Sequence, residues 1–200
     1  GAFHQPIAVY IDPNFLKTLP KREFGAGVAE IVKMAVTFNK DFFEWLEQND
    51  LTKDENIRVA IAKSVQTKAD VVSQDEKELG IRAALNYGHT FGHVIENETN
   101  YDTYLHGEAV GIGMCMANAL AVKIGLMSKD EELRVKNLLE KYDIPTTYKI
   151  KDVEDFYEHF FLDKKSLDNK IKFILPVGIG DCKITNEVTK DNVIEILKGF

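Results

Sequence analysis

Apolar residues recur at three- and four-residue intervals along most of this chain, which is the spacing of amphipathic helices. The pattern predicts helices over residues 24–47, 54–74, 82–98, 106–125, 129–142, 152–162 and 190–198. Residues 170–176 instead alternate like a strand, and the glycines at 178 and 180 predict a hairpin after it. We therefore expect a mainly α, multihelical domain with a minor β element, and 44% hydrophobic content over 200 residues is enough for one sizeable core.

Capping residues predict where several of these helices begin and end. Hydroxyl and carboxylate side chains accept hydrogen bonds from the first N–H groups of a helix, which makes Thr52 or Asp54 and Ser128 candidate N-caps. Glycine adopts the left-handed backbone that ends many helices, which makes Gly80 and Gly125 candidate stops.

The apolar run at residues 7–12, which ends in Asp-Pro, predicts a buried strand. No second strand-like segment lies near it in the sequence. We therefore expect this strand to belong to a sheet whose other strands lie upstream of residue 1, and the chain to be a fragment.

Composition and charge exclude several functions. A net charge of −7 argues against nucleic acid as a partner, because a phosphate backbone requires a basic face. No apolar run reaches the ~18 residues of a membrane span, and the N-terminus lacks the pattern of a signal peptide. Cys115 and Cys182 have no metal-binding spacing, so we expect both to be reduced in a cytoplasmic protein.

Four polar residues follow one another at helical offsets in the most informative segment. Arg82, Asn86, His89 and His93 are separated by four, three and four residues, which predicts that they share one face of a helix. Gly88 and Gly92 interrupt the same segment, although each glycine costs about 1 kcal/mol in a helix interior. These glycines indicate that something approaches the backbone closely beside the histidines.

Two histidines and one carboxylate would make a catalytic zinc site with room for substrate. By spacing alone, His89 and His93 are the obvious histidine pair, whereas His106 opens the next helix and is free to reach the same site. Glu30 is the best candidate for the carboxylate, because it lies on an otherwise apolar helix with Lys33 three residues later. A salt bridge between Glu30 and Lys33 at the helix edge is the alternative.

Several cations would make a local anion pocket in this acidic protein. Lys68 precedes an acidic segment that leads to Arg82, and Lys164 and Lys165 lie in a loop before the predicted strand. Taken one at a time, each segment is typical of a solvated surface. Together with Lys33, they favour a small substrate that carries phosphate and carboxylate groups.

Seven segments resemble the 3-dehydroquinate synthase family in their order and spacing, over nearly the whole chain. The most specific is Asn-Tyr-Gly-His-Thr-Phe-Gly-His at residues 86–93, and the others are residues 1–6, 19–23, 27–33, 75–82, 106–109 and 163–165. The resemblance implies the multihelical C-terminal domain of that fold. Residues 1–20 would then end an N-terminal nucleotide-binding domain and its linker, and residues 21–200 would form the metal- and substrate-binding domain.

The resemblance also implies a role for each candidate residue. The metal, zinc or another divalent ion such as cobalt, would be held by Glu30, His89 and His106. The catalytic residues would be Glu78 as a proton acceptor, His93 and Lys33. The substrate contacts would be Lys68, Arg82, Asn86, His93 and Lys164, and the contacts to NAD would be Phe15, Leu16, Lys17 and Thr18. Ala26 departs from the family, because some members carry asparagine near the cofactor.

The implied reaction converts 3-deoxy-D-arabino-heptulosonate 7-phosphate to 3-dehydroquinate and phosphate, the second step of the shikimate pathway. It combines a transient oxidation by NAD with phosphate elimination, reduction and an intramolecular aldol closure. We expect the chain to be inactive without the N-terminal domain, and the full-length protein to be a homodimer.

Three other functions remain open. A 2-deoxy-scyllo-inosose synthase would share the histidines, but its substrate, glucose 6-phosphate, has no carboxylate for Arg82. An iron-type alcohol dehydrogenase would lack the Glu30 and Lys33 pair. The third is a zinc-binding domain without catalytic activity.

Overall fold

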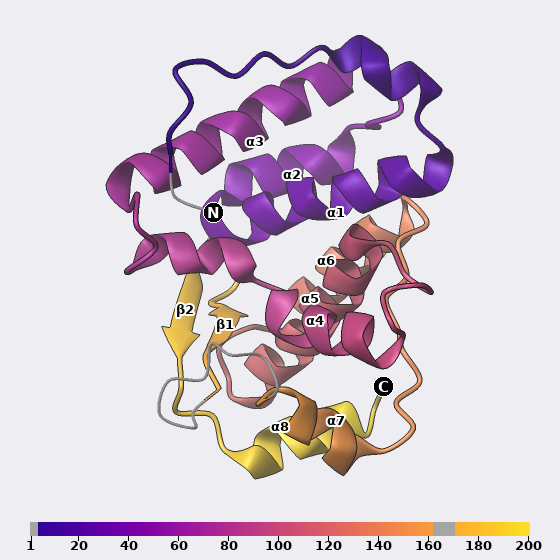
Figure 1. Ribbon diagram of the computed structural model, residues 1–200, viewed down its shortest axis with the longest axis vertical. Coiled ribbons are helices and arrows are strands. Elements are labelled where there is room, and N and C mark those ends of the chain that lie inside the picture. The colour runs from indigo at the N-terminus through magenta and orange to yellow at the C-terminus, as the bar shows by residue number, and fades with distance from the viewer. Residues whose placement is uncertain (1–3, 162–170) are drawn as a thin grey trace.

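The computed structural model describes residues 4–161 and 171–200, and most of its elements are helices (Figure 1). In chain order they are the 3-10 helix η1 (Pro13–Thr18), α1 (Lys21–Phe38), α2 (Lys40–Gln48), α3 (Asp54–Gln74), the 3-10 helix η2 (Ile81–Asn86), α4 (His89–Glu98), α5 (His106–Lys123), α6 (Lys129–Glu140), α7 (Val153–His159), β1 (Phe173–Pro176), β2 (Cys182–Thr185) and α8 (Lys190–Leu197). The expectation of a mainly α domain with a minor β element is confirmed.

Helix α5 is the centre of the domain. Its residues are buried almost without interruption from Gly107 to Ala121, and it contacts α1, α4, α6, α8 and β1. A helix that neighbours cover on all sides is apolar around its whole circumference, and α5 carries a run of alanine, isoleucine, methionine and glycine. In Figure 1, α1, α2 and α3 lie on one side of it, and the hairpin, α7 and α8 lie on the other.

The predicted hairpin forms at the expected place. Strands β1 and β2 pair antiparallel, with Phe173 opposite Thr185 and Pro176 opposite Cys182. The glycines of the turn, Gly178 and Gly180, both have positive φ, at 62° and 103°, which explains why glycine is needed there. All four residues of β1 are buried, and this strand packs on α5.

Two of the predicted helices are broken. The helix predicted over residues 24–47 ends at Phe38, because Asn39 turns the backbone to φ −154° and its side chain caps α2 by accepting a hydrogen bond from Phe42 N at 2.8 Å. The helix predicted over residues 82–98 is divided into η2 and α4 by Gly88, whose φ is 81°. A left-handed residue cannot continue a right-handed helix.

The strand predicted at residues 7–12 is wrong for this structure. These residues form no strand, and the side chains of Ile7, Val9 and Tyr10 are exposed. An isolated strand leaves its N–H and C=O groups unpaired, and no strand in the described residues lies beside this segment.

The capping predictions had mixed outcomes. Ser128 caps α6 as expected, in a capping box with Glu131, and Gly125 follows α5 with φ 77°. Neither Thr52 nor Asp54 is the N-cap of α3, because the helix begins at Asp54 and its N-cap is Lys53, which makes no side-chain hydrogen bond there. Gly80 does not end α3 either, because the helix ends at Gln74, six residues earlier. No helix in residues 4–161 or 171–200 is both long and apolar enough to cross a membrane.

Candidate functional site

Three helices bring one carboxylate and two imidazoles together. Glu30 lies in the middle of α1, His89 is the first residue of α4, and His106 is the first residue of α5. One donor atom from each lies within 4.8 Å of the other two, and the rings of the two histidines are 5.1 Å apart. Glu30 is 76 positions before His106 in the sequence, so only the packing of α1, α4 and α5 creates the cluster.

A glycine and an ion pair fix the start of α5 against α1. A Cβ atom on Gly107 would lie 2.1 Å from the carbonyl oxygen of Ala26, so only glycine permits this approach. Beside it, Arg22 donates to both carboxylate oxygens of Glu108 at 2.6 Å, and Glu108 also accepts a hydrogen bond from Leu105 N. These contacts hold His106 at a set distance from Glu30.

The two glycines of the histidine segment are explained by α5. A Cβ atom on Gly88 would lie 2.7 Å from Met114 Cγ and 2.8 Å from Val110 O, and one on Gly92 would lie 3.1 Å from Ala109 O. Something does approach the backbone closely at these positions, as predicted. It is the neighbouring helix, which packs α4 tightly enough to place His89 beside His106.

The two oxygens of Glu30 have different surroundings. Oε2 accepts a hydrogen bond from Lys33 Nζ at 2.6 Å, whereas Oε1 is buried without a hydrogen-bond partner and lies 4.0 Å from His89 Nε2. Burial opposes ionisation of Glu30, but the charge and hydrogen bond of Lys33 outweigh it and lower the Glu30 pKa. The salt bridge proposed as the alternative is present, and it still leaves one carboxylate oxygen facing the histidines.

In both histidines the Nδ1 atom lies beside an acceptor oxygen. His89 Nδ1 lies 3.2 Å from the carbonyl oxygen of Tyr87, and His106 Nδ1 lies 2.9 Å from Glu96 Oε1. Burial, assisted by the charge of Lys33, lowers the pKa of His89 to about 4, so this imidazole is neutral at pH 7. A neutral imidazole is the form that binds a metal ion.

His93 lies next to this cluster without joining it. Its ring is 5.5 Å from that of His89 and 6.3 Å from that of His106, but the group whose donor atoms meet within 4.8 Å contains His106 and not His93. The arrangement therefore favours the ligand set that the family resemblance implied over the His89 and His93 pair that spacing alone favoured. The identity of the ligands remains a prediction.

The residues predicted to contact the substrate lie on different elements of the structure. Lys68 lies on α3 close enough to Lys33 for its charge to lower the Lys33 pKa, behind the larger effect of burial. Arg82 and Asn86 lie on η2 and not on α4, so the prediction that they share one helix face with His89 and His93 is wrong. The left-handed break at Gly88 is the cause. Lys164, with its neighbours Asp163 and Lys165, lies outside the described residues.

The segment that carries Glu78 is organised by one carboxylate. Asp75 accepts hydrogen bonds from the backbone N–H groups of Leu79, Gly80 and Arg82, at 2.8–3.0 Å. Glu78 sits within this turn at φ 59°, a conformation that costs a residue with a side chain about 1–2 kcal/mol, and it accepts a hydrogen bond from Asn86 Nδ2 at 2.8 Å. Two of the predicted functional residues are thus in direct contact.

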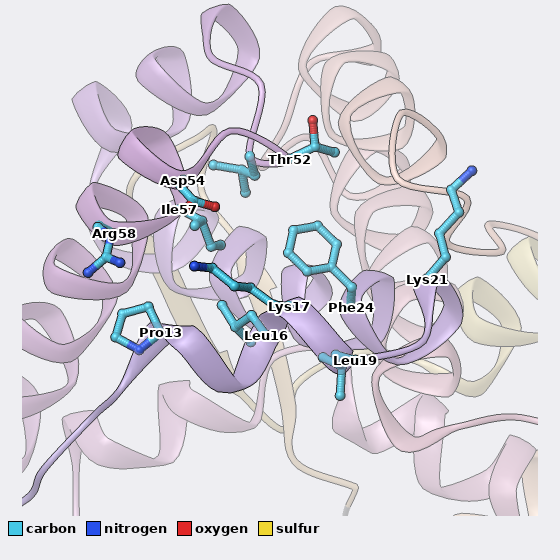
Figure 2. Close-up of a pocket in the computed structure, with 11 residues that line it drawn as sticks. Pro13, Leu16, Lys17, Leu19, Lys21, Phe24, Thr52, Asp54, Ile57 and Arg58 are labelled. Carbon is cyan, nitrogen blue, oxygen red and sulfur yellow. The ribbon is translucent and has the colours of Figure 1, made fainter.

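The stretch predicted to contact NAD borders a separate pocket of about 290 Å³ (Figure 2). Leu16 and Lys17 of η1 line it together with Phe24, Ile57 and Arg58, while Phe15 is 77% exposed. Thr18 donates to the carbonyl of Phe15. None of the three clustered metal-donor residues lines this pocket.

Sequence reasoning missed a second group of possible metal donors, Glu98, Asp155 and His159, whose donor atoms also lie within 4.8 Å of one another. The hydroxyl of Tyr148 donates to Glu98 at 2.7 Å, and His159 lies 3.5 Å from Glu98 and 4.0 Å from Asp155. These contacts tie α7 to the end of α4. Residues 98 and 159 are far apart in the sequence, so no spacing pattern could have predicted this group of donors.

Sequence reasoning also missed the partners of the histidine cluster. Glu96 follows His89 by seven residues and His93 by three, so the helical spacing that singled out the histidines also marks Glu96. The pair of Arg22 and Glu108 had no comparable signal, because these residues lie on different helices.

Two solved structures that share this fold are sugar-phosphate cyclases. A 2-epi-5-epi-valiolone synthase from Streptomyces hygroscopicus subsp. jinggangensis, solved with NAD+ and Zn2+ bound, matches 94% of this chain and 54% of its own, at a TM-score of 0.84 and 27% identity. A 2-deoxy-scyllo-inosose synthase complexed with carbaglucose-6-phosphate, NAD+ and Co2+ matches 94% of this chain and 55% of its own, at a TM-score of 0.75 and 23% identity.

Residues 27–166 match the family described as 3-dehydroquinate synthase C-terminal, and the chain belongs to this family. It is 68% identical to the 3-dehydroquinate synthase of Sulfurimonas denitrificans and 62% identical to that of Nitratiruptor sp., over all 200 residues in both cases. The chain spans 57% of the length of each of these relatives.

Proposed function

We propose that the protein is a 3-dehydroquinate synthase, which converts 3-deoxy-D-arabino-heptulosonate 7-phosphate to 3-dehydroquinate and phosphate in the cytoplasm. The observation that carries this proposal is the meeting of Glu30, His89 and His106 from three helices, with Lys33 bound to the carboxylate. Membership of the family supports it, and so does the identity of 68% and 62% to two proteins of that name.

The donor set suits a zinc ion. Two imidazoles and one carboxylate leave coordination positions for substrate, and Glu30 Oε1 is a buried acceptor that lacks a hydrogen-bond partner. Zinc, when bound, would polarise the substrate's hydroxyl and carbonyl oxygens, and NAD would accept and return a hydride. Neutral His89 would be ready to bind without first releasing a proton.

The chain's own cations would bind and orient the substrate. Lys33, Lys68, Arg82 and Lys164 would neutralise its phosphate and carboxylate, and Asn86 would add a neutral hydrogen bond. Glu78 would accept a proton, and its contact with Asn86 would hold its carboxylate in one orientation. His93, one turn after His89, would contact the phosphate as it departs.

An N-terminal domain would supply most of the NAD site. The coverage of only 57% of each relative supports a further domain, and η1, with exposed Phe15 beside Leu16, Lys17 and Thr18, would be this chain's contribution to the cofactor. We also propose that the full-length protein is a homodimer.

The test is phosphate release by the natural full-length protein, with NAD and zinc, from the heptulosonate phosphate. Glucose 6-phosphate serves as the competing substrate, because a 2-deoxy-scyllo-inosose synthase shares the fold. We expect turnover of the heptulosonate phosphate alone, and none by the isolated 200-residue chain. Preferential turnover of glucose 6-phosphate would replace this function with that of a different cyclase, and turnover of neither would leave a metal-binding domain without this activity.

A further inference from the structure

His106 is the least constrained member of the candidate metal cluster. It is the first residue of α5, and its side chain is 52% exposed, whereas that of His89 is only 12% exposed. An exposed side chain loses rotamer entropy when it is held in one orientation. Packing therefore orients His89, but a specific contact is needed to orient His106.

Glu96 is placed to provide that contact. It lies on the face of α4 that also carries His89 and His93, and its side chain is only 9% exposed. Its Oε1 lies 2.9 Å from Nδ1 of His106, which is hydrogen-bond distance. A buried carboxylate needs such a partner, because without one its charge is costly to keep out of water.

We propose that Glu96 is a positioning residue that sets both the orientation and the tautomer of His106, an inference that rests on the proposed metal site. An ionised carboxylate can only accept hydrogen bonds, so Nδ1 of His106 must donate. The proton is then on Nδ1, and the lone pair on Nε2 is directed to the metal together with Glu30 and His89. The backbone carbonyl of Tyr87 would do the same for His89, with a neutral acceptor in place of a charged one.

The test is the zinc dissociation constant of the natural full-length protein, measured by competition with a chelator of known affinity. Loss of a carboxylate behind a metal-binding histidine typically weakens metal binding by 10- to 100-fold. We expect a loss in that range for Glu96→Gln, which keeps the size and an acceptor oxygen but removes the charge, and a larger loss for Glu96→Ala.

Glu47→Gln is the control. Glu47 lies on α2, its side chain is 29% exposed, and it accepts hydrogen bonds from Arg134 at 2.9 and 2.6 Å. It belongs to neither of the two groups of possible metal donors among the described residues. Glu47→Gln should therefore leave the zinc dissociation constant unchanged, even where it lowers the melting temperature.

Two further measurements separate positioning from a structural role. In the zinc-loaded wild type, the Nδ1 proton of His106 should give an NMR signal protected from exchange with water, and this signal should weaken in Glu96→Gln. A purely structural Glu96 would instead lower the melting temperature of the metal-free protein and leave zinc affinity at the wild-type value, which would overturn the inference. If the wild type binds no zinc, or His106→Ala binds it normally, the proposed metal site fails as well.

Discussion

Arg22 on α1 and Glu108 on α5 form a two-point ion pair in which both hydrogen bonds measure 2.6 Å. The same arginine donates to the carbonyl of Thr103 at 2.7 Å, so it ties the loop before α5 as well as its first turn to α1. Neither residue belongs to the candidate metal cluster. Their pairing nevertheless joins the helix that carries His106 to the helix that carries Glu30.

We expect Arg22→Ala to lower the melting temperature at pH 7, and the effect to become smaller in acid, where only the hydrogen bond to the carbonyl of Thr103 is left to lose. The pKa of Glu108 is lowered, since the hydrogen bonds from Arg22 and Leu105 outweigh the opposing effect of burial. A carboxyl with a lowered folded pKa stabilises the protein above its unfolded pKa, about 4.3, and this contribution is lost as the pH falls through the folded value.

The measurement is the difference in melting temperature between wild type and Arg22→Ala from pH 7 down to pH 3. Lys21→Ala is the control, because Lys21 pairs with Asp143 where both side chains are mostly exposed, and such pairs contribute little. An Arg22→Ala difference that stays constant down to pH 3 would show that the ion pair does not cause it.

Substitution of the two histidines nearest His89 should separate metal binding from other roles. We expect His106→Ala to lose most of its zinc, and His93→Ala to keep it, because His106 and not His93 belongs to the group of donors within 4.8 Å. Zinc content per chain, measured by elemental analysis after gel filtration, tests this. Equal losses in the two variants would show that the choice of His106 over His93 as the metal ligand is wrong.

His89 should remain neutral in the metal-free protein down to unusually low pH. Burial lowers its pKa to about 4, against about 6.5 for an unperturbed histidine. Because the unfolded chain binds the proton first, stability contributed by this group falls as the pH drops from 6.5 towards 4. NMR titration of the imidazole Cε1–H signals checks this, and a midpoint for His89 near 6.5 would contradict the buried environment.

Gly88 should not tolerate a side chain. Its φ of 81° costs alanine about 1–2 kcal/mol, and the contacts with Met114 and Val110 add to that cost. Gly88→Ala should therefore unfold at lower urea concentration than wild type. Gly27→Ala is the control, since Gly27 lies in α1 with open space around it, and there alanine should stabilise the helix by roughly 0.5–1 kcal/mol. Equal stability of the two variants would refute the close packing of α4 on α5.

Arg82 should determine the preference for a substrate with a carboxylate. A guanidinium grips a carboxylate at two points, which lysine cannot do. In the full-length protein, Arg82→Lys should lower kcat/KM for the heptulosonate phosphate roughly 10- to 150-fold, the equivalent of one charge-assisted hydrogen bond. Zinc content should not change. If Arg82→Lys kept full activity, Arg82 would not be the residue that selects a carboxylate-bearing substrate. The assignment would then extend only to the broader class of sugar-phosphate cyclases.

Local patterns in the sequence were enough for the helices, the hairpin and the family. Helical periodicity and glycine turns depend on residues close together in the chain, and so do the histidine motif and the cap at Ser128. The same local reasoning failed where one residue overrides a periodic pattern. Asn39 and Gly88 each end a helix that the apolar spacing would continue, and residues 7–12 look like a strand but have no strand beside them among the described residues.

The composition of the candidate site was decided by tertiary packing. Spacing along α4 favours His89 with His93, because a local pattern compares only residues on one helix. Glycine contacts at Gly88 and Gly107 and the ion pair of Arg22 with Glu108 bring three helices close enough that His106 meets Glu30 instead. Such distances depend on side-chain volumes and buried charges from distant parts of the chain, and no periodicity within one segment encodes them.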